Sequence, residues 1–299
     1  MRYDHLGEVF NSTFTHYNET VNGIKIHYVM GGDGPPLVLL HGYPQTWYTF
    51  RHIMPELAKH FTVIAPDLRG LGDSERPQGG YDTYSVASDI FELVTAMGYK
   101  TVDLLGHDFG ANVAYAYAAS YRDSVSKLVL LDIGILSEAL ANSPLLPRKG
   151  RSLWWFPFHM VHGLPEELIA GRESDYINWF FKNSTYIKSA ICSTDLKEYA
   201  MSYGSLGGMS AGFNYYRALF NDIDLNEQHA KIKLKMPVLV LGGEYSFGLK
   251  AFESWKNVAE NIQGGIVADA GHYIPEEQPQ LLLDLILPFY NHQLSTINR

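Results

Sequence analysis

Leu104-Leu105-Gly106-His107-Asp108-Phe109-Gly110-Ala111 is the segment with the strongest signal in the sequence. An apolar run leads into a glycine, an acidic residue and a second glycine, and an alanine-rich segment then continues to Ser120. This order predicts a strand that turns sharply into a helix and presents Asp108 at the turn, as a nucleophile elbow with aspartate in place of serine. Glycines suit a turn where other backbone comes too close for a Cβ atom. An ordinary strand-to-helix turn capped by Asp108 is the alternative.

Short apolar runs on both sides of this segment predict an α/β fold with buried parallel strands. Two alternating runs, 14–21 and 24–30, flank Asn22-Gly23 and predict an antiparallel hairpin. We also expect a helix near 251–261, a strand near 265–269 and a last helix from Pro279. The predicted parallel strands include Leu37–Leu40, Val63–Ala65, Val102–Leu105, Leu128–Leu131 and Val238–Leu241.

The sequence between Ile133 and about Asp224 has a different character, because aromatic residues become frequent and strand-like runs disappear. Helical spacing takes their place, which predicts a helical cap inserted into the core. We therefore expect an α/β core formed by 1–133 and 227–299, and a cap domain formed by 134–226.

Composition excludes several classes of function. Lys and Arg number 23 against 32 Asp and Glu, a net charge of −9, so no basic field favours nucleic acid. No apolar run approaches the roughly 20 residues of a membrane span. One cysteine, Cys192, excludes an internal disulfide. The first ten residues show no secretory leader, so we expect a cytoplasmic protein, or a secreted or periplasmic one if a leader was trimmed.

Partners for Asp108 lie in other strand-end loops. Tyr43, in His41-Gly42-Tyr43-Pro44, follows a strand, and its amide could form an oxyanion hole together with the amide of Phe109. His272 lies in a loop between the last strand and a helix, which suits a general base. The acid that orients it is Asp132 or Glu244, both at strand ends; we favour Asp132.

An aspartate nucleophile itself indicates the type of reaction. A carboxylate displaces a leaving group from a saturated carbon and leaves an ester whose carbonyl belongs to the protein. Water activated by His272 would then attack Asp108. The strand-to-helix turn carries Asp108 where a serine esterase carries its nucleophilic serine, which disfavours a serine esterase.

Three segments together resemble the epoxide hydrolase and dehalogenase branch of the α/β-hydrolase fold. They are His41–Pro44, Gly106–Gly110 and Gly271-His272. The resemblance implies a mostly parallel sheet of the eight-stranded type, helices on both faces, an inserted cap, no metal or organic cofactor, a small-molecule substrate, and a monomer or homodimer. It also implies opening of a small hydrophobic epoxide to a vicinal diol. More narrowly, the chain resembles the Cif group, which are bacterial epoxide hydrolases. The segments that carry this resemblance are Gln45–Tyr48, Met54–Lys59, Leu168–Gly171 and Tyr215–Leu219. Known members of the group are secreted, and they carry glutamate where we place Asp132.

The resemblance also assigns roles in the cap. Tyr216 matches the tyrosine that protonates the opening epoxide. The position where Cif-type members carry histidine, and other epoxide hydrolases tyrosine, is Trp155, whose indole donates a hydrogen bond but delivers no proton as a phenol does. Ring opening then rests on Tyr216 alone, or His159 substitutes. We expect the substrate pocket to include His41, Trp155, Phe158, His159 and Tyr215.

Two alternatives use the same framework. A haloalkane or haloacid dehalogenase would share the aspartate nucleophile, but the arginines that haloacetate dehalogenases carry one and four residues after it are Phe109 and Asn112 here. Haloalkane dehalogenases place a tryptophan beside the nucleophile as a halide donor. Phe109 has no N–H to take that role, but Trp155 could supply one from the cap. The second alternative is a ligand-binding protein with little turnover, which an intact set of Asp108, Asp132 and His272 disfavours.

Overall fold

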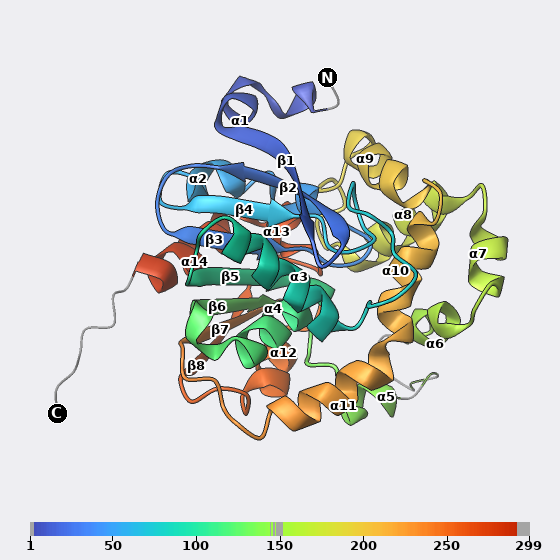
Figure 1. Ribbon diagram of the computed structural model, residues 1–299. Coiled ribbons are helices and arrows are strands. Elements are labelled where there is room, and N and C mark those ends of the chain that lie inside the picture. The colour runs from blue at the N-terminus through green and yellow to red at the C-terminus, as the bar shows by residue number, and fades with distance from the viewer. Residues whose placement is uncertain (1–2, 144, 146, 148–151, 292–299) are drawn as a thin grey trace.

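The computed structural model describes residues 3–143, 145, 147 and 152–291, and its centre is a single eight-stranded sheet (Figure 1). The strand order is β1-β2-β4-β3-β5-β6-β7-β8. β1 and β2 are antiparallel to each other, β2 is antiparallel to β4, and all other neighbours are parallel. The strands are β1 Phe14–Val21, β2 Ile24–Gly31, β3 Pro36–Leu40, β4 Thr62–Pro66, β5 Val102–His107, β6 Val125–Leu131, β7 Val238–Gly243 and β8 Ile262–Val267.

The predicted strands form with small shifts at the carboxyl-terminal end of the chain. Asn22 and Gly23 both have positive φ, 50° and 77°, as a tight hairpin between β1 and β2 requires. β8 begins at Ile262, before the predicted 265, because Ile262 pairs with Val238 of β7. The helix expected over 251–261 is shorter, Leu249–Trp255.

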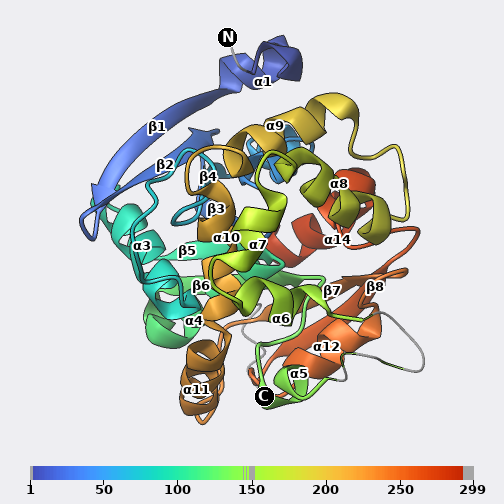
Figure 2. The same cartoon turned by 90° about the vertical axis from the view of Figure 1, so that its right-hand side faces the viewer.

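Helices cover both faces of the sheet, as expected for this fold. α3 and α4 lie on one face and α14 lies on the other (Figure 2). α12 shares the face of α4, where Trp255 packs on Tyr115 at 5.3 Å between ring centroids. These and the remaining core helices are α1 Glu8–Thr13, α2 Met54–Leu57, α3 Thr83–Ala96, α4 Phe109–Ser120, α12 Leu249–Trp255, α13 Ile274–Glu277 and α14 Pro279–Asn291, with 3₁₀ turns η1 Asp4–Leu6, η2 Trp47–Phe50 and η3 Arg122–Ser124.

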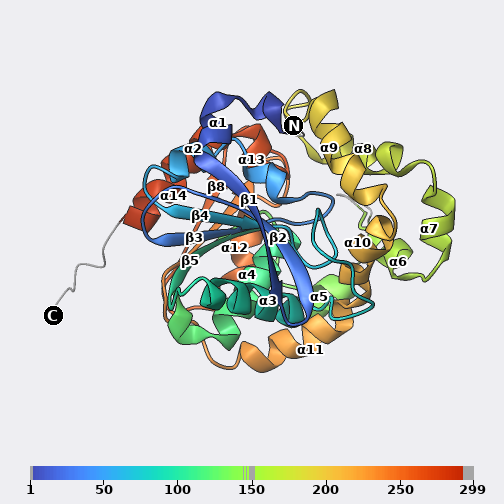
Figure 3. The ribbon, with the colours of Figure 1, turned by 45° about the horizontal axis from the view of Figure 1, so that its top comes forward.

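Between β6 and β7 the described residues form seven helices joined by loops, and α6 to α10 gather beyond one end of the sheet (Figure 3). Residues 144, 146 and 148–151 of the predicted cap lie outside the described residues. The predicted boundary between 226 and 227 falls inside α11, which packs against α3 and α4 of the core. The helices are α5 Glu138–Ala141, α6 Trp155–Met160, α7 Leu164–Ile169, α8 Glu173–Ser184, α9 Ser193–Tyr203, α10 Gly208–Arg217 and α11 Leu219–His229.

Within the part of the chain that the structure describes, every helix falls short of the length and apolarity that crossing a bilayer would require.

Candidate active site

Asp108 occupies the turn between β5 and α4 in a strained conformation, with φ 53° and ψ −130°. The two flanking glycines are sterically required. A Cβ atom on Gly106 would lie 2.3 Å from the carbonyl oxygen of Gly110, and one on Gly110 would lie 2.0 Å from that of Leu40. The turn therefore has the geometry of a nucleophile elbow, and it presents the carboxylate at the end of the parallel strands.

Two backbone amides bind the carboxylate of Asp108. The N–H of Tyr43 donates to Oδ1 at 2.9 Å, and the N–H of Phe109 also donates to the carboxyl group. Tyr43 can approach so closely because its neighbour is Gly42, where a Cβ atom would lie 2.3 Å from Oδ1 of Asp108. The pair of donors suits an oxyanion that forms on the carboxyl carbon.

His272 lies between two carboxylates. Its Nε2 is 3.4 Å from Oδ2 of Asp108, and its Nδ1 is 2.7 Å from Oδ2 of Asp132. Asp132 follows β6 with a positive φ of 49°, and its Oδ1 accepts N–H bonds from Gly243 at 2.7 Å and Phe247 at 3.3 Å. Residues from three strand ends thus hold the imidazole between Asp108 and Asp132.

Glu244, the alternative acid, has a different contact. Its Oε2 accepts the backbone N–H of Asp269 at 3.1 Å at an exposed site, so the carboxylate braces the loop that follows β8. The contact with His272 that an orienting acid needs is made by Asp132.

Electrostatics hold Asp108 and His272 as an ion pair. Burial pushes the pKa of Asp108 up, but the hydrogen bond and charge of His272 outweigh it and leave that pKa below its ordinary value. Burial disfavours the imidazolium of His272, yet hydrogen bonds to Asp108 and Asp132 raise its pKa to about 9. Asp108 is therefore ionised and His272 protonated at neutral pH.

Tyr216 extends from α10 of the cap toward this group. Its buried ring makes edge-to-face contacts with Phe109 at 4.9 Å and Tyr43 at 5.5 Å. Burial raises the pKa of Tyr216 well above its ordinary value, and the negative charge of Asp108 adds to the effect. The hydroxyl therefore stays protonated and can donate a hydrogen bond.

Two predicted pocket residues use their polar atoms to hold loops. His41 accepts the N–H of Leu68 on Nε2 at 3.1 Å and donates from Nδ1 to the carbonyl of Gly42 at 3.1 Å. Tyr215 donates to the carbonyl of Arg69 at 2.8 Å, while its ring lies 5.7 Å from that of Phe109. These contacts place His41 and the Tyr215 hydroxyl within the scaffold of the site.

The other three predicted pocket residues belong to α6. Trp155 packs against Phe180 of α8 at 5.7 Å between ring centroids. Phe158 is partly buried, and its ring centroid lies 6.3 Å from that of Tyr176. His159 is fully buried, and its ring centroid is 4.4 Å from that of Tyr216. Of the three, His159 has the direct ring contact with Tyr216.

Comparison with known proteins identifies the family. The family described as alpha/beta hydrolase fold matches residues 35–279. The chain belongs to the α/β-hydrolase fold family. It is 36% identical over 294 residues to a soluble epoxide hydrolase from Corynebacterium sp. (strain C12), covering 94% of this chain and 98% of the relative.

Solved α/β-hydrolase structures agree with this assignment. Cfl2 from Burkholderia cenocepacia superimposes with a TM-score of 0.89 at 40% identity and covers 93% of this chain and 96% of its own. The Cif epoxide hydrolase from Acinetobacter nosocomialis shares the fold at a TM-score of 0.88, with 24% identity and 94% of each chain covered. The predicted resemblance to epoxide hydrolases is therefore confirmed in the sequence, and the resemblance to the Cif epoxide hydrolase is confirmed at the level of the fold.

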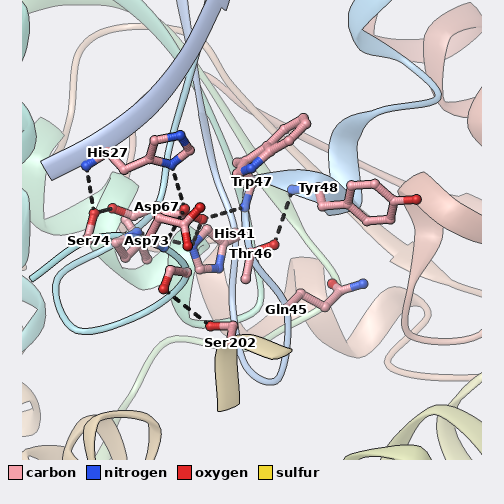
Figure 4. A network of polar contacts seen from close by, with 12 residues as sticks. His27, His41, Gln45, Thr46, Trp47, Tyr48, Asp67, Asp73, Ser74 and Ser202 are labelled. Atoms are coloured by element: carbon pink, nitrogen blue, oxygen red, sulfur yellow. Dashed lines mark hydrogen bonds and ion pairs between the residues drawn. The ribbon is translucent and has the colours of Figure 1, made fainter. Parts of the chain in front are cut away.

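Asp67 lies at the centre of a network of polar contacts beside the loop that follows β3 (Figure 4). Its carboxylate accepts the N–H groups of Trp47 at 3.0 Å and Asp73 at 2.9 Å and pairs with Nδ1 of His27 at 2.7 Å. Nε2 of His27 is bonded in turn to His16 at 2.9 Å. Among the described residues, His27, Asp67 and Asp73 are the only group whose atoms lie close enough to share a metal ion, but both nitrogens of His27 are already in hydrogen bonds. We interpret the group as a brace for the loop after β3.

A buried ionic group, which the sequence did not indicate, connects the cap to the core of the hydrolase. Arg51, in the loop after η2, pairs with Glu276 of α13 at 2.7 Å and with Asp195 of α9 at 2.9 Å. Tyr199 of α9 donates a short hydrogen bond to Glu276. Burial raises the pKa of Glu276 to about 7 against the opposing charge of Arg51. The guanidinium of Arg51 thus links α9 of the cap to α13, the helix that follows the loop of His272.

The loop that carries His272 is anchored on both sides. The N–H of His272 donates to the carbonyl of Ser184 at the end of α8, at 2.8 Å, and the carbonyl of His272 accepts from Nε2 of His107 at 2.7 Å. Glu277 accepts backbone N–H groups from the loop and from the cap segment after α8. These donors are Gly271 and Tyr273 on the loop side, and Tyr186 and Ile187 on the cap side.

Proposed function

We propose that this chain is an epoxide hydrolase that opens its substrate through a covalent ester on Asp108. The observation that carries the proposal is the contact set of one carboxylate: Asp108 is held by two amide donors and faces His272, which is itself bonded to Asp132. The proposal is supported by 36% identity to a protein named soluble epoxide hydrolase.

In the first step, a carboxylate oxygen of Asp108 attacks a ring carbon of the epoxide. The new bond is the ester C–O bond, and the bond that breaks is the ring C–O bond, whose electron pair moves to the epoxide oxygen. Tyr216, whose ring lies against that of Phe109 next to the nucleophile, donates a hydrogen bond and then a proton to this oxygen. The product of the step is a hydroxyalkyl ester of Asp108.

The second step uses the change of charge that the first step brings. Ester formation removes the negative charge of Asp108, which was one of the two carboxylates that raise the pKa of His272. The proton that His272 then loses restores the hydroxyl of Tyr216, and the neutral imidazole can accept a proton from water. The hydroxide attacks the carboxyl carbon of Asp108, and the amides of Tyr43 and Phe109 bind the oxyanion. Collapse breaks the ester C–O bond, and the departing alkoxide takes a proton from His272 to complete the diol. The carboxylic acid left on Asp108 then passes its proton to His272, which restores the ion pair.

The contacts of Asn112 give less support to the dehalogenase alternative than to epoxide hydrolysis. In place of an arginine that would bind a haloacid carboxylate, the side chain of Asn112 donates to the carbonyl of Gly134 at 3.3 Å and accepts the N–H of Leu136 at 3.0 Å. This side chain holds the start of the segment that leads into the cap. Epoxide opening, which needs a hydroxyl donor such as Tyr216, is favoured.

The test is the intact mass of a His272→Gln variant incubated with terminal epoxides, haloacids and haloalkanes. Without the base the ester accumulates, so the proposal expects a gain equal to the whole epoxide mass, mapped to Asp108 by peptide analysis. The matched control is Asp108→Ala in the same background, which should gain nothing. A gain equal to the substrate minus hydrogen halide would establish dehalogenation. No adduct from any of these compounds would contradict a covalent mechanism at Asp108.

The domain division at 133/134 and 226/227, the monomeric or homodimeric state and the cytoplasmic location stay predictions. Light scattering on a sizing column tests the state of assembly, and cell fractionation tests the location.

A further inference from the structure

The aromatic wall of the cap contains a small polar group, formed by Tyr43, His159 and Tyr176. His159 and Tyr176 are joined by a hydrogen bond of 2.6 Å between Nε2 and the hydroxyl. The ring of Tyr43 meets that of His159 edge to face at 5.4 Å. Around them the wall is apolar or aromatic, because Phe213 stacks on His159 at 4.3 Å and Phe180 meets Tyr43 at 5.7 Å. We call these three residues the Tyr43–His159–Tyr176 group.

Two polar atoms of this group are buried and have no hydrogen-bond partner within the described chain. They are the hydroxyl of Tyr43, a residue that is 4% exposed, and Nδ1 of His159, a residue that is 0% exposed. A buried polar atom without a partner costs free energy, so proteins satisfy such atoms with few exceptions, and the exceptions cluster where a ligand binds. Two such atoms on neighbouring rings point to a polar group supplied from outside the chain.

The chemistry of the two atoms selects a neutral hydroxyl group. Burial and the nearby charge of Arg217 lower the pKa of His159 to about 3, so its ring is neutral. Whichever nitrogen carries the proton, Nδ1 then offers either a hydrogen or a lone pair, and the hydroxyl of Tyr43 can donate or accept. An alcohol can pair with both atoms in either tautomer. A carboxylate is disfavoured, because the guanidinium of Arg217 already pairs with Glu166 at 2.8 Å.

The position of the group relates it to the reacting centre. The amide of Tyr43 binds Asp108 at 2.9 Å, so its side chain starts at the nucleophile and extends into the cap. The ring of Tyr216 touches both Tyr43 and His159, at 5.5 Å and 4.4 Å. A substrate held by Asp108 and Tyr216 therefore has this polar group beside it, a few carbon atoms from the epoxide ring.

We propose that the Tyr43–His159–Tyr176 group recognises a hydroxyl on the substrate, so that the preferred substrates are epoxides that also carry an alcohol. This inference rests on the proposed epoxide hydrolase function and names the substrate class within it. The aromatic wall accepts the carbon chain, and the polar group selects the chain that bears the alcohol.

The test compares 1,2-epoxyhexane with its analogues that carry a hydroxyl on carbon 4, 5 or 6. We expect kcat/KM for the best alcohol to exceed that for 1,2-epoxyhexane by about 10- to 100-fold in the wild type, since the unsubstituted chain leaves both polar atoms unpaired. Tyr43→Phe and His159→Phe should each bring this ratio close to one. The ratio is taken within each variant, so a general loss of activity cancels. Circular dichroism and thermal unfolding identify a variant that has not folded, and the other variant then decides.

Tyr203→Phe is the matched control. Its ring also meets Tyr43 edge to face, at 5.3 Å, but its hydroxyl already donates to the carbonyl of Gln45 at 3.1 Å. The control should keep the wild-type ratio, and an equal fall in its ratio would overturn the inference. A wild-type ratio near one, with both compounds turned over, would refute the inference and leave the proposed function intact. No turnover of any epoxide would refute the proposed function instead.

Discussion

The pKa of His272 offers a direct test of the interpretation of the site. Replacing Asp108 by Asn keeps the shape of the nucleophile and removes its charge, as ester formation does. In the wild type the pKa of His272 is raised from 6.5 to about 9, which corresponds to roughly 3 kcal/mol in favour of the imidazolium. In the variant, burial still lowers the pKa of His272, but only the carboxylate of Asp132 remains to raise it. We expect the pKa to fall by at least about one pH unit.

The assay is an NMR titration of the imidazole nitrogens, with the His272 signal identified by its loss in His272→Gln. Asp103→Asn is the control, because Asp103 is a buried carboxylate at the opposite end of β5 and should leave the titration unchanged. A His272 that titrates near 6.5 in the wild type, or equally in wild type and Asp108→Asn, would refute the coupling on which the second catalytic step depends.

The same coupling has a consequence for stability. Because the pKa of His272 in the folded protein lies above its unfolded value of about 6.5, folding gains stability that is fully present below pH 6.5. This contribution is lost as the pH rises through about 9. Urea denaturation at pH 6 and pH 9.5 should show a smaller pH dependence in Asp108→Asn than in the wild type.

Three substitutions test the rest of the site. Arg51→Met should lower the free energy of unfolding by about 3–5 kcal/mol in urea denaturation, since it leaves two buried carboxylates without their cation. Gly42→Ala should lower kcat by at least about 100-fold, because its Cβ atom would lie 2.3 Å from Oδ1 of Asp108; Gly79→Ala, with nothing within 4 Å, should have no effect. Asp132→Asn should lower kcat by about 10⁴-fold through loss of the bond to the catalytic base, whereas Glu244→Gln should change it little.

Each of these results has an opposite that would contradict it. Lys59→Met, at an exposed pair, should change stability by no more than about 0.5 kcal/mol, and a similarly small effect of Arg51→Met would mean that its ionic group is hydrated. Normal kinetics in Gly42→Ala would show that the nucleophile can move freely. A larger effect of Glu244→Gln than of Asp132→Asn would reverse the assignment of the acid.

The residues around the nucleophile could be predicted because each follows a strand. Asp108, Asp132 and His272 come from segments distant in sequence, but parallel strands bring their carboxyl ends to one edge of the sheet. The turn at Asp108 was also marked by its glycines, whose absent Cβ atoms the backbone requires. Local patterns were therefore enough to nominate these residues.

Contacts between the cap and the core had no comparable signal. Arg51, Asp195 and Glu276 are three charged residues among many, and only the packing of α9 against the core brings them together. His159 and Tyr176 sit on different helices, 17 residues apart, and no periodic pattern pairs them. The limit of the cap was predicted inside α11 because the change in composition does not coincide with the end of a helix.

The anchoring of the His272 loop limits how the cap can move during turnover. Rotation of the whole cap away from the sheet would break the bonds from Tyr186 and Ile187 to Glu277 and from His272 to Ser184, and it would leave a buried carboxylate partly unpaired. The end of α8 is therefore a fixed point of the cap, whereas α7 lies at its outer edge (Figure 3). Under the proposed function, we expect substrate entry and diol release to pass on the side of α7, so stiffening α7 would slow product release without altering the chemistry at Asp108.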